Sequence, residues 1–234
     1  MRSIALLLFL AALLSAQSAP EVEITAEPHH HLVFANDQVR IFNVEVPPHT
    51  DTAMHRHLHD YLYVQLGNAE VINAVKGKDP VTVKLQDGQV GFLSASYSHV
   101  ARNQTDQPFH NVTIELLQDE KLRHASSKRD EDRGLNVLQG GTKEILFVKD
   151  GIRVSEVELQ PGGVMPLPDH PGPILFVALS DLTFRAQQIK NQAHSAWADL
   201  DRKRGDSVFV PATPFLGWRN VGHSPNKFVT LEFP

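Results

Sequence analysis

The sequence contains no cysteine among its 234 residues. A disulfide framework, a lipid-anchored lipoprotein and a thiol nucleophile are thereby excluded. Positive charge is also scarce, because 22 basic residues stand against 27 acidic ones and no basic patch with interleaved aromatic residues occurs. Binding to nucleic acid is therefore not expected, and a small molecule is the expected partner.

Several sequence signatures of enzymes are missing too. No glycine-rich phosphate loop follows a strand-like segment, and no Gly-x-Ser-x-Gly motif occurs. Ser94, Ser96 and Ser98 lie close to His99, but the segment has no evident acidic residue to orient a catalytic histidine. A serine-type hydrolase is therefore not expected.

A long apolar run occurs at the N-terminus. Arg2 is followed by the apolar segment 4–14, which is too short to span a bilayer, and then by small residues. This pattern predicts a cleavable signal peptide over residues 1–18, with cleavage after Ser18 or after Ala16. We expect an exported protein, periplasmic or secreted, with no membrane association after cleavage.

The rest of the chain contains many short strand-like segments separated by turn residues. Such a series is typical of all-β sandwiches and barrels. A charged stretch, residues 118–134, interrupts the series and predicts a linker between the domains 19–117 and 135–234. The expected strands are 39–46, 61–66, 81–85, 90–93 and 112–117 in the first domain, and 144–148, 152–159, 174–179, 182–185, 207–210 and 228–233 in the second.

The two domains repeat the same spacing. Four residues of the first domain have counterparts 117 positions later, and the segments 62–66 and 175–179 are also similar. One internal duplication explains these matches and predicts two similar β-barrels in tandem. The pairs are Gly88 and Gly205, Ser94 and Pro211, His99 and Leu216, and Asn103 and Asn220.

Metal-ligand residues gather in one segment of the first domain. His55 and His57 alternate along a strand-like segment, so their side chains project from the same face. His59 and Asp60 follow, and His99 lies on a later strand. Imidazole is a common ligand of transition metals. The pattern predicts one divalent transition metal ion, which is iron, manganese, zinc, nickel or copper.

These motifs resemble those of the cupin superfamily. The stretch 48–67 resembles the first cupin motif, in which His-x-His is followed by an acidic residue seven positions before a glycine. The stretch 88–103 resembles the second motif, which ends in His-x-x-x-Asn. The resemblance implies an exported bicupin, with two tandem jelly-roll (double-stranded β-helix) barrels. It also implies that His55, His57 and His99 point inward at one metal ion, together with an acidic residue.

The acidic position departs from the family pattern. It holds Asp60 in place of glutamate, and the loop before it is shorter than usual, so His59 competes for the same role. A turn or bulge near Leu58 would place the alternate apolar residues of the next strand inside the barrel and Asp60 on the metal side. An apolar core favours this arrangement. The predicted ligands are therefore His55, His57, Asp60 and His99, with His59 as the alternative.

The other histidines are assigned no ligand role. His29, His30 and His31 are consecutive, so their side chains point apart and cannot all bind one ion. An exposed N-terminal arm or a strand edge is expected for them. In the second domain Leu216 occupies the position that corresponds to His99, and His170 lies among prolines. We therefore expect a metal-free second barrel that packs against the first.

Three functions remain open from the sequence. The first is a metal-dependent oxygenase, isomerase or lyase that acts on a small organic molecule. The second is a non-catalytic module that binds a metal or a small ligand, and the third is a scaffold for a homo-oligomer. Arg56 and Gln65, which could serve as further catalytic groups, are expected to face away from the pocket.

Overall fold

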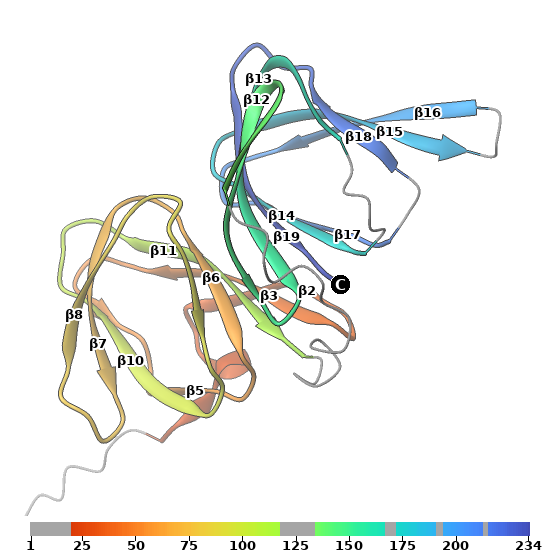
Figure 1. Ribbon diagram of the computed structural model, residues 1–234. Helices are drawn as coiled ribbons and strands as arrows, with labels where there is room; N and C mark the ends of the chain where they lie inside the picture. The colour runs from red at the N-terminus through yellow and green to blue at the C-terminus, as the bar shows by residue number, and fades with distance from the viewer. Residues whose placement is uncertain (1–19, 118–133, 167–171, 191–193, 213–214) are drawn as a thin grey trace, which may run out of the picture.

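The computed structural model describes residues 20–117, 134–166, 172–190, 194–212 and 215–234. The predicted signal peptide and all of the predicted linker except Gly134 lie outside the described residues. Figure 1 shows two bodies of β-strands, one from each half of the chain. Within the described ranges the one helical element is the 3₁₀ turn η1 (Ile24–Ala26), and no helix there is long and apolar enough to cross a membrane.

Two sheets form the first body. One sheet has the order β1-β5-β10-β7-β8, with β4 paired to β10, and the other has the order β2-β3-β11-β6-β9. Apart from the parallel pair β1 and β5, the strands are antiparallel, and strands that alternate between two such sheets are the arrangement of a jelly-roll barrel. The strands are β1 (Val22–Glu23), β2 (His30–Ala35), β3 (Val39–Val46), β4 (Thr50–Asp51), β5 (His55–His57), β6 (Tyr61–Gln65), β7 (Ala69–Val75), β8 (Val81–Leu85), β9 (Val90–Leu93), β10 (Tyr97–Asn103) and β11 (Phe109–Leu116).

One continuous sheet of eight strands forms the second body. Its order is β16-β15-β18-β13-β19-β14-β17, with β12 paired to β13. The long strand β13 pairs with β19 along its first half and with β18 at its end, so it belongs to both sides of the barrel. The strands are β12 (Gly134–Lys149), β13 (Ile152–Pro166), β14 (Ile174–Ala178), β15 (Leu182–Lys190), β16 (His194–Arg202), β17 (Ser207–Val210), β18 (Phe215–Asn220) and β19 (Asn226–Glu232).

The all-β prediction is confirmed. Strands β3, β8, β9 and β17 have the predicted bounds, whereas β7 and β16 were not expected from the sequence. Strand β7 reads Ala-Glu-Val-Ile-Asn-Ala-Val, in which apolar neighbours break the simple alternation of a half-buried strand. Strand β7 is defined by its hydrogen-bonded pairing with β8 and β10, which the local sequence pattern does not indicate.

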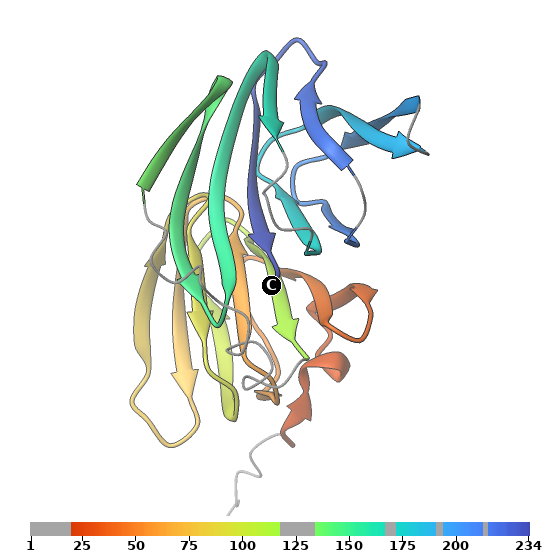
Figure 2. The same ribbon diagram turned by 45° about the vertical axis from the view of Figure 1, so that its right-hand side comes forward.

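An apolar interface joins the two bodies. Leu62 and Val64 of β6 belong to the same buried cluster as Val154 of β13 and Leu175 of β14. In both Figure 1 and Figure 2 the turn of the β12–β13 hairpin reaches the first body. The sheet that contains β6 is therefore apolar on the face that packs against the second body.

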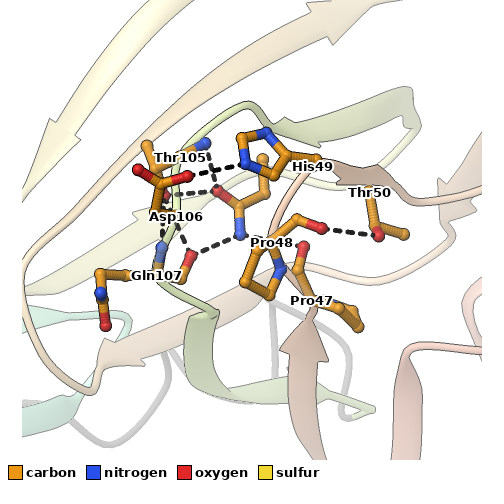
Figure 3. A network of polar contacts seen from close by, with 8 residues as sticks. Pro47, Pro48, His49, Thr50, Thr105, Asp106 and Gln107 are labelled. Carbon is orange, nitrogen blue, oxygen red and sulfur yellow. Dashed lines mark hydrogen bonds and ion pairs between the residues drawn. The ribbon is translucent and has the colours of Figure 1, made fainter.

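The duplication extends to individual hydrogen bonds at the barrel rim. The Asn103 side-chain amide donates to the carbonyl oxygens of Val46 at 3.0 Å and of Gln107 at 2.8 Å. Its Oδ1 accepts from the backbone N–H of Thr105 at 3.1 Å. Figure 3 shows this network around Thr105, Gln107 and the turn at Pro47. Asn103 is thus a turn residue that closes the rim, as its place in the sequence predicts.

Asn220 repeats this network in the second body. Its amide donates to the carbonyl oxygens of Leu159 at 2.9 Å and of Ser224 at 2.8 Å, and its Oδ1 accepts from the N–H of Gly222 at 2.9 Å. Leu159 lies 113 positions after Val46, and Ser224 and Gly222 each lie 117 positions after the corresponding partners of Asn103. Both bodies are therefore copies of one barrel, down to the bonds of one side chain.

The interior of the second barrel is filled with aromatic side chains. Trp218, which occupies the position that corresponds to Ala101, has its ring 4.8 Å from that of Phe176 and 6.1 Å from that of Phe184. His170 and the side chain of Leu216 lie outside what the structure describes, so a metal-free second barrel stays a prediction. The described interior supports a packing role for this barrel.

Candidate metal centre

Four histidines from three strands gather inside the first barrel. His55 and His57 come from β5, His99 from the neighbouring strand β10, and His30 from β2 of the opposite sheet. The candidate ligand nitrogens of His30, His55 and His57 lie within 4.8 Å of one another. The ring of His99 has its centroid 4.4 Å from that of His55. We call this group the histidine cluster.

Three members of the histidine cluster have one ring nitrogen fixed by an acceptor. His55 Nδ1 donates to the carbonyl oxygen of Ala53 at 2.9 Å, and His99 Nδ1 donates to Asn73 Oδ1 at 2.8 Å. His30 Nδ1 donates to the Glu27 carboxylate at 2.6 Å. Because Nδ1 carries the proton in each case, Nε2 is left with its lone pair, as in metal-bound histidines.

The fourth member, His57, lacks a complete set of partners. Its Nε2 lies 3.3 Å from His99 Nε2, and its Nδ1 is buried without a hydrogen-bond partner. His55 Nε2 is likewise buried and unpartnered. Two nitrogens bound to one ion at about 2.0–2.1 Å in tetrahedral geometry lie about 3.3 Å apart. The donor set therefore fits a metal ion, which would bind His55 Nε2 and the two neighbouring Nε2 atoms of His57 and His99.

Burial keeps His55, His57 and His99 in the neutral, ligating form. Burial and the nearby His30 together lower the pKa of His55 to about 4. Burial, with the neighbouring histidines, also lowers the pKa values of His57 and His99 to about 2. A metal binds neutral imidazole, so these side chains are ready to bind at neutral pH without losing a proton.

Glu27 supports the histidine cluster from behind. Its buried carboxylate accepts from His30 Nδ1, from the backbone N–H of His29 at 2.8 Å and from the N–H of Ala53 at 3.0 Å. Burial alone would raise its pKa, but these hydrogen bonds outweigh burial and lower the pKa to about 2. Through Ala53, whose carbonyl holds His55, one carboxylate orients two members of the cluster.

Replacing Glu27 with glutamine tests this role. The amide offers one oxygen in place of two, so either Ala53 or His30 loses its acceptor, and we expect metal affinity to fall about 10–100-fold. Competition with a chelator of known affinity measures the change. Glu45→Gln, at an exposed position of β3, is the matched control and should bind metal as the wild type does. An unchanged affinity in Glu27→Gln would contradict the orienting role.

Neither Asp60 nor His59 lines the cavity that the four members of the histidine cluster line. Asp60 Oδ1 accepts from the backbone N–H of Ala95 at 2.7 Å, in the short segment between β5 and β6. His59 lies in the field of Arg40 and Glu23, and burial lowers its pKa. Of the four ligands predicted from the sequence, the structure brings together His55, His57 and His99.

The parity argument that favoured Asp60 is wrong. A break between β5 and β6 does occur, as predicted, but the apolar residues Leu62 and Val64 face the second barrel and not the interior. Tyr61 and Tyr63 line the interior cavity instead. The apolar face of a strand usually points into its own barrel. The apolar face of β6 instead forms the interface between the two barrels.

Neither Gln65 nor Arg56 lines the cavity. Gln65 is fully buried, with its amide donating to the carbonyl of Gly67, so it adds no catalytic group to the pocket, as predicted. Arg56 is half-exposed and pairs with Glu21 at 3.6 Å, so it faces away from the pocket as predicted.

His30 is the residue that sequence reasoning missed. The three consecutive histidines do point apart, but the middle one is buried and joins the cluster, while His31 is exposed. The predicted strand-edge placement is confirmed, and the structure brings His30 within 4.8 Å of the ligand nitrogens of His55 and His57, which the sequence did not predict. Glu27, three residues earlier, is the local signal that could have indicated a metal-binding histidine with its supporting carboxylate.

Comparison with known proteins gives information on the fold. No protein-family profile and no curated protein match the sequence. Oxalate decarboxylase from Bacillus subtilis, studied for its Mn(II) centres, superposes with a TM-score of 0.61 and 12% identity over 85% of this chain and 69% of its own. The formate complex of oxalate decarboxylase from Lactobacillus farciminis gives 0.60 and 14%, over 85% and 78%. The chain has the fold of two tandem cupin barrels.

A single cupin domain from Bordetella pertussis Tohama I matches a smaller region. It is 25% identical over 37% of this chain and 90% of its own, with a TM-score of 0.36. In the tandem cupin fold described here, the histidine cluster lies inside the N-terminal barrel.

Proposed function

We propose that the N-terminal cupin barrel is a mononuclear metal centre that acts on a small organic molecule. The observation that carries the proposal is the convergence of the histidine nitrogens, in which His57 Nε2 lies 3.3 Å from His99 Nε2 and the buried His55 Nε2 has no hydrogen-bond partner. Leaving a buried nitrogen such as His55 Nε2 unsatisfied costs about 1–3 kcal/mol, and a bound divalent ion removes this cost. The proposed ligands are His30, His55, His57 and His99.

The reaction proposed is that of an oxygenase, isomerase or lyase. A bound metal supplies Lewis acidity or electron transfer to an oxygen-containing substrate. Burial holds His55, His57 and His99 in their neutral form, and the chain forms a cavity of about 300 Å³ beside them. The Mn(II) centres of the B. subtilis enzyme support such chemistry on this fold, and the N-terminal sequence supports export.

A second candidate is a binding module without turnover. Among the described residues that line the cavity there is no carboxylate or amine to act as a general base. Catalysis would then depend on the metal and on the tyrosine hydroxyls. Release of an unchanged ligand after incubation with the metal-loaded protein would favour this candidate.

The identity of the fourth ligand tests the proposed site. We expect the wild type, purified in its exported form, to hold one metal ion per chain by elemental analysis. His30→Ala should weaken metal binding at least about tenfold, because it removes a ligand. Asp60→Asn should change the affinity less than about twofold, because that side chain bonds to Ala95. A wild type without metal, or retention by His30→Ala with loss by Asp60→Asn, would overturn the proposed ligand set.

A further inference from the structure

Hydrogen bonds connect the histidine cluster to a tyrosine pair in the cavity wall. His99 Nδ1 donates to Asn73 Oδ1, and Asn73 Nδ2 donates to Tyr97 Oη at 3.4 Å. The ring of Tyr61 stacks on that of Tyr97 with the centroids 6.4 Å apart, and both residues line the cavity. Tyr97 Oη is an acceptor of the hydrogen bond from Asn73.

The bond from Asn73 leaves the Tyr97 proton for another acceptor. A hydroxyl has one proton and two lone pairs, and the Asn73 amide occupies a lone pair and not the proton. The Tyr97 ring lies 4.7 Å from that of His99 and 5.8 Å from that of His57, and all three residues line the cavity. The free donor is therefore beside the proposed metal ligands and within reach of a molecule in the cavity.

The shape and charge of the cavity narrow the class of molecule. Its volume of about 300 Å³ is roughly twice that of a cavity known to hold benzene. Tyr61 stacks on His57 at 4.0 Å, and aliphatic side chains such as Val71 and Leu85 form much of the remaining wall. None of the described lining residues is lysine or arginine, so no side chain there would neutralise a ligand carboxylate.

We propose that the cavity takes an uncharged, ring-containing oxygen compound, such as a phenol, whose oxygen accepts a hydrogen bond from Tyr97. This inference rests on the proposed metal centre and specifies its ligand. A small dicarboxylate such as oxalate is disfavoured, although oxalate decarboxylases share the fold. When oxalate chelates the ion, its two remaining carboxylate oxygens would lose their hydration against a described wall that supplies no lysine or arginine.

Catechol and oxalate are suitable probes because both chelate a metal through two oxygens but differ in charge and ring. We expect catechol to bind the Zn²⁺-loaded wild type at least about tenfold more tightly than oxalate by anaerobic titration calorimetry. Tyr97→Phe should weaken catechol binding about three- to tenfold, the loss of one hydrogen bond, with metal content and oxalate affinity unchanged. Ser98→Ala is the matched control, because it removes a hydroxyl from the next residue of β10, which does not line the cavity, and it should not change either affinity.

The outcomes separate this inference from the proposed function. A wild type that takes up no Zn²⁺ overturns the metal centre and the ligand class together. A protein that takes up Zn²⁺ but prefers oxalate, or whose catechol affinity is the same in Tyr97→Phe, overturns the ligand class alone. A misfolded variant would show in its circular dichroism spectrum, in which case Tyr97→Trp, which keeps a ring and a different donor, replaces it.

Discussion

Replacement of His55 or His99 by alanine is expected to weaken metal binding by about 10²–10³-fold. A four-ligand site with an apparent binding free energy of about 10–16 kcal/mol gains about 3–4 kcal/mol per ligand. His55 is fully buried and its Nε2 has no protein partner, so no neighbouring group can take its place. Elemental analysis of the purified variants, and chelator competition with added metal, measure the loss.

His59→Ala and His170→Ala are the matched controls for these variants. The first removes the histidine that competed with Asp60 in the sequence, and the second removes the one histidine near the corresponding motif of the second barrel. Both should keep the wild-type metal content. Circular dichroism of the metal-free proteins separates lost binding from lost folding. Full metal content in His55→Ala and His99→Ala would refute the site.

The second large effect is the pH dependence of the metal-free protein. Its free energy of unfolding is expected to fall as the pH drops below about 6.5. The folded-state pKa values of His55, His57 and His99, at about 4, 2 and 2, lie below the usual value of 6.5, so the unfolded chain binds more protons in this range. Each group contributes about 1.4 kcal/mol per pH unit.

Glu115 opposes this trend over part of the range. Burial raises its pKa to about 7, against the effect of Arg40 at 2.8 Å, so the folded chain binds the extra proton between pH 4.5 and 7. Three histidines lower the free energy of unfolding as the pH falls, and one glutamate raises it. The net change is up to about 3 kcal/mol per pH unit between pH 4.5 and 6.5. Urea unfolding after treatment with a chelator measures this slope.

A variant isolates the histidine contribution. His57→Leu replaces a buried ionisable ring with an apolar side chain of similar size, and should flatten the slope by about 1.4 kcal/mol per pH unit whatever its effect on stability at pH 7. A wild-type slope near zero, or one of opposite sign, would show that the histidine cluster is protonated in the folded state. If the free energy of unfolding changed equally with pH in the wild type and in His57→Leu, His57 would not contribute to the pH dependence.

The repeat was readable from the sequence because turns and rims impose local requirements. Asn103 and Asn220 each close a rim by bonding to carbonyls of a turn four residues later, and this short-range geometry fixes their spacing. His55, His57 and His99 were readable for a related reason. Alternation along a strand places two of them on one face, and the antiparallel pairing of β5 with β10 places the third opposite His55.

The orientation of β6 could not be read in the same way. Leu62 and Val64 are buried, as an apolar pattern predicts, but burial does not say what covers a residue. Only the docking of the second barrel, through Val154 and Leu175, showed that this face is an interface. The tyrosines on the other face were thereby placed in the cavity, and the reason for choosing Asp60 as a ligand disappeared.

The sequence by itself determined the tandem all-β fold and three members of the histidine cluster, because these depend on alternation and on contacts between paired strands. The tertiary structure alone decided that His30 joins them and that Glu27 supports the site. His30 lies 25 positions before His55, on a strand of the opposite sheet. Closure of the barrel brings the ring centroids of His30 and His55 to 4.6 Å from each other, and no local sequence pattern indicates that proximity.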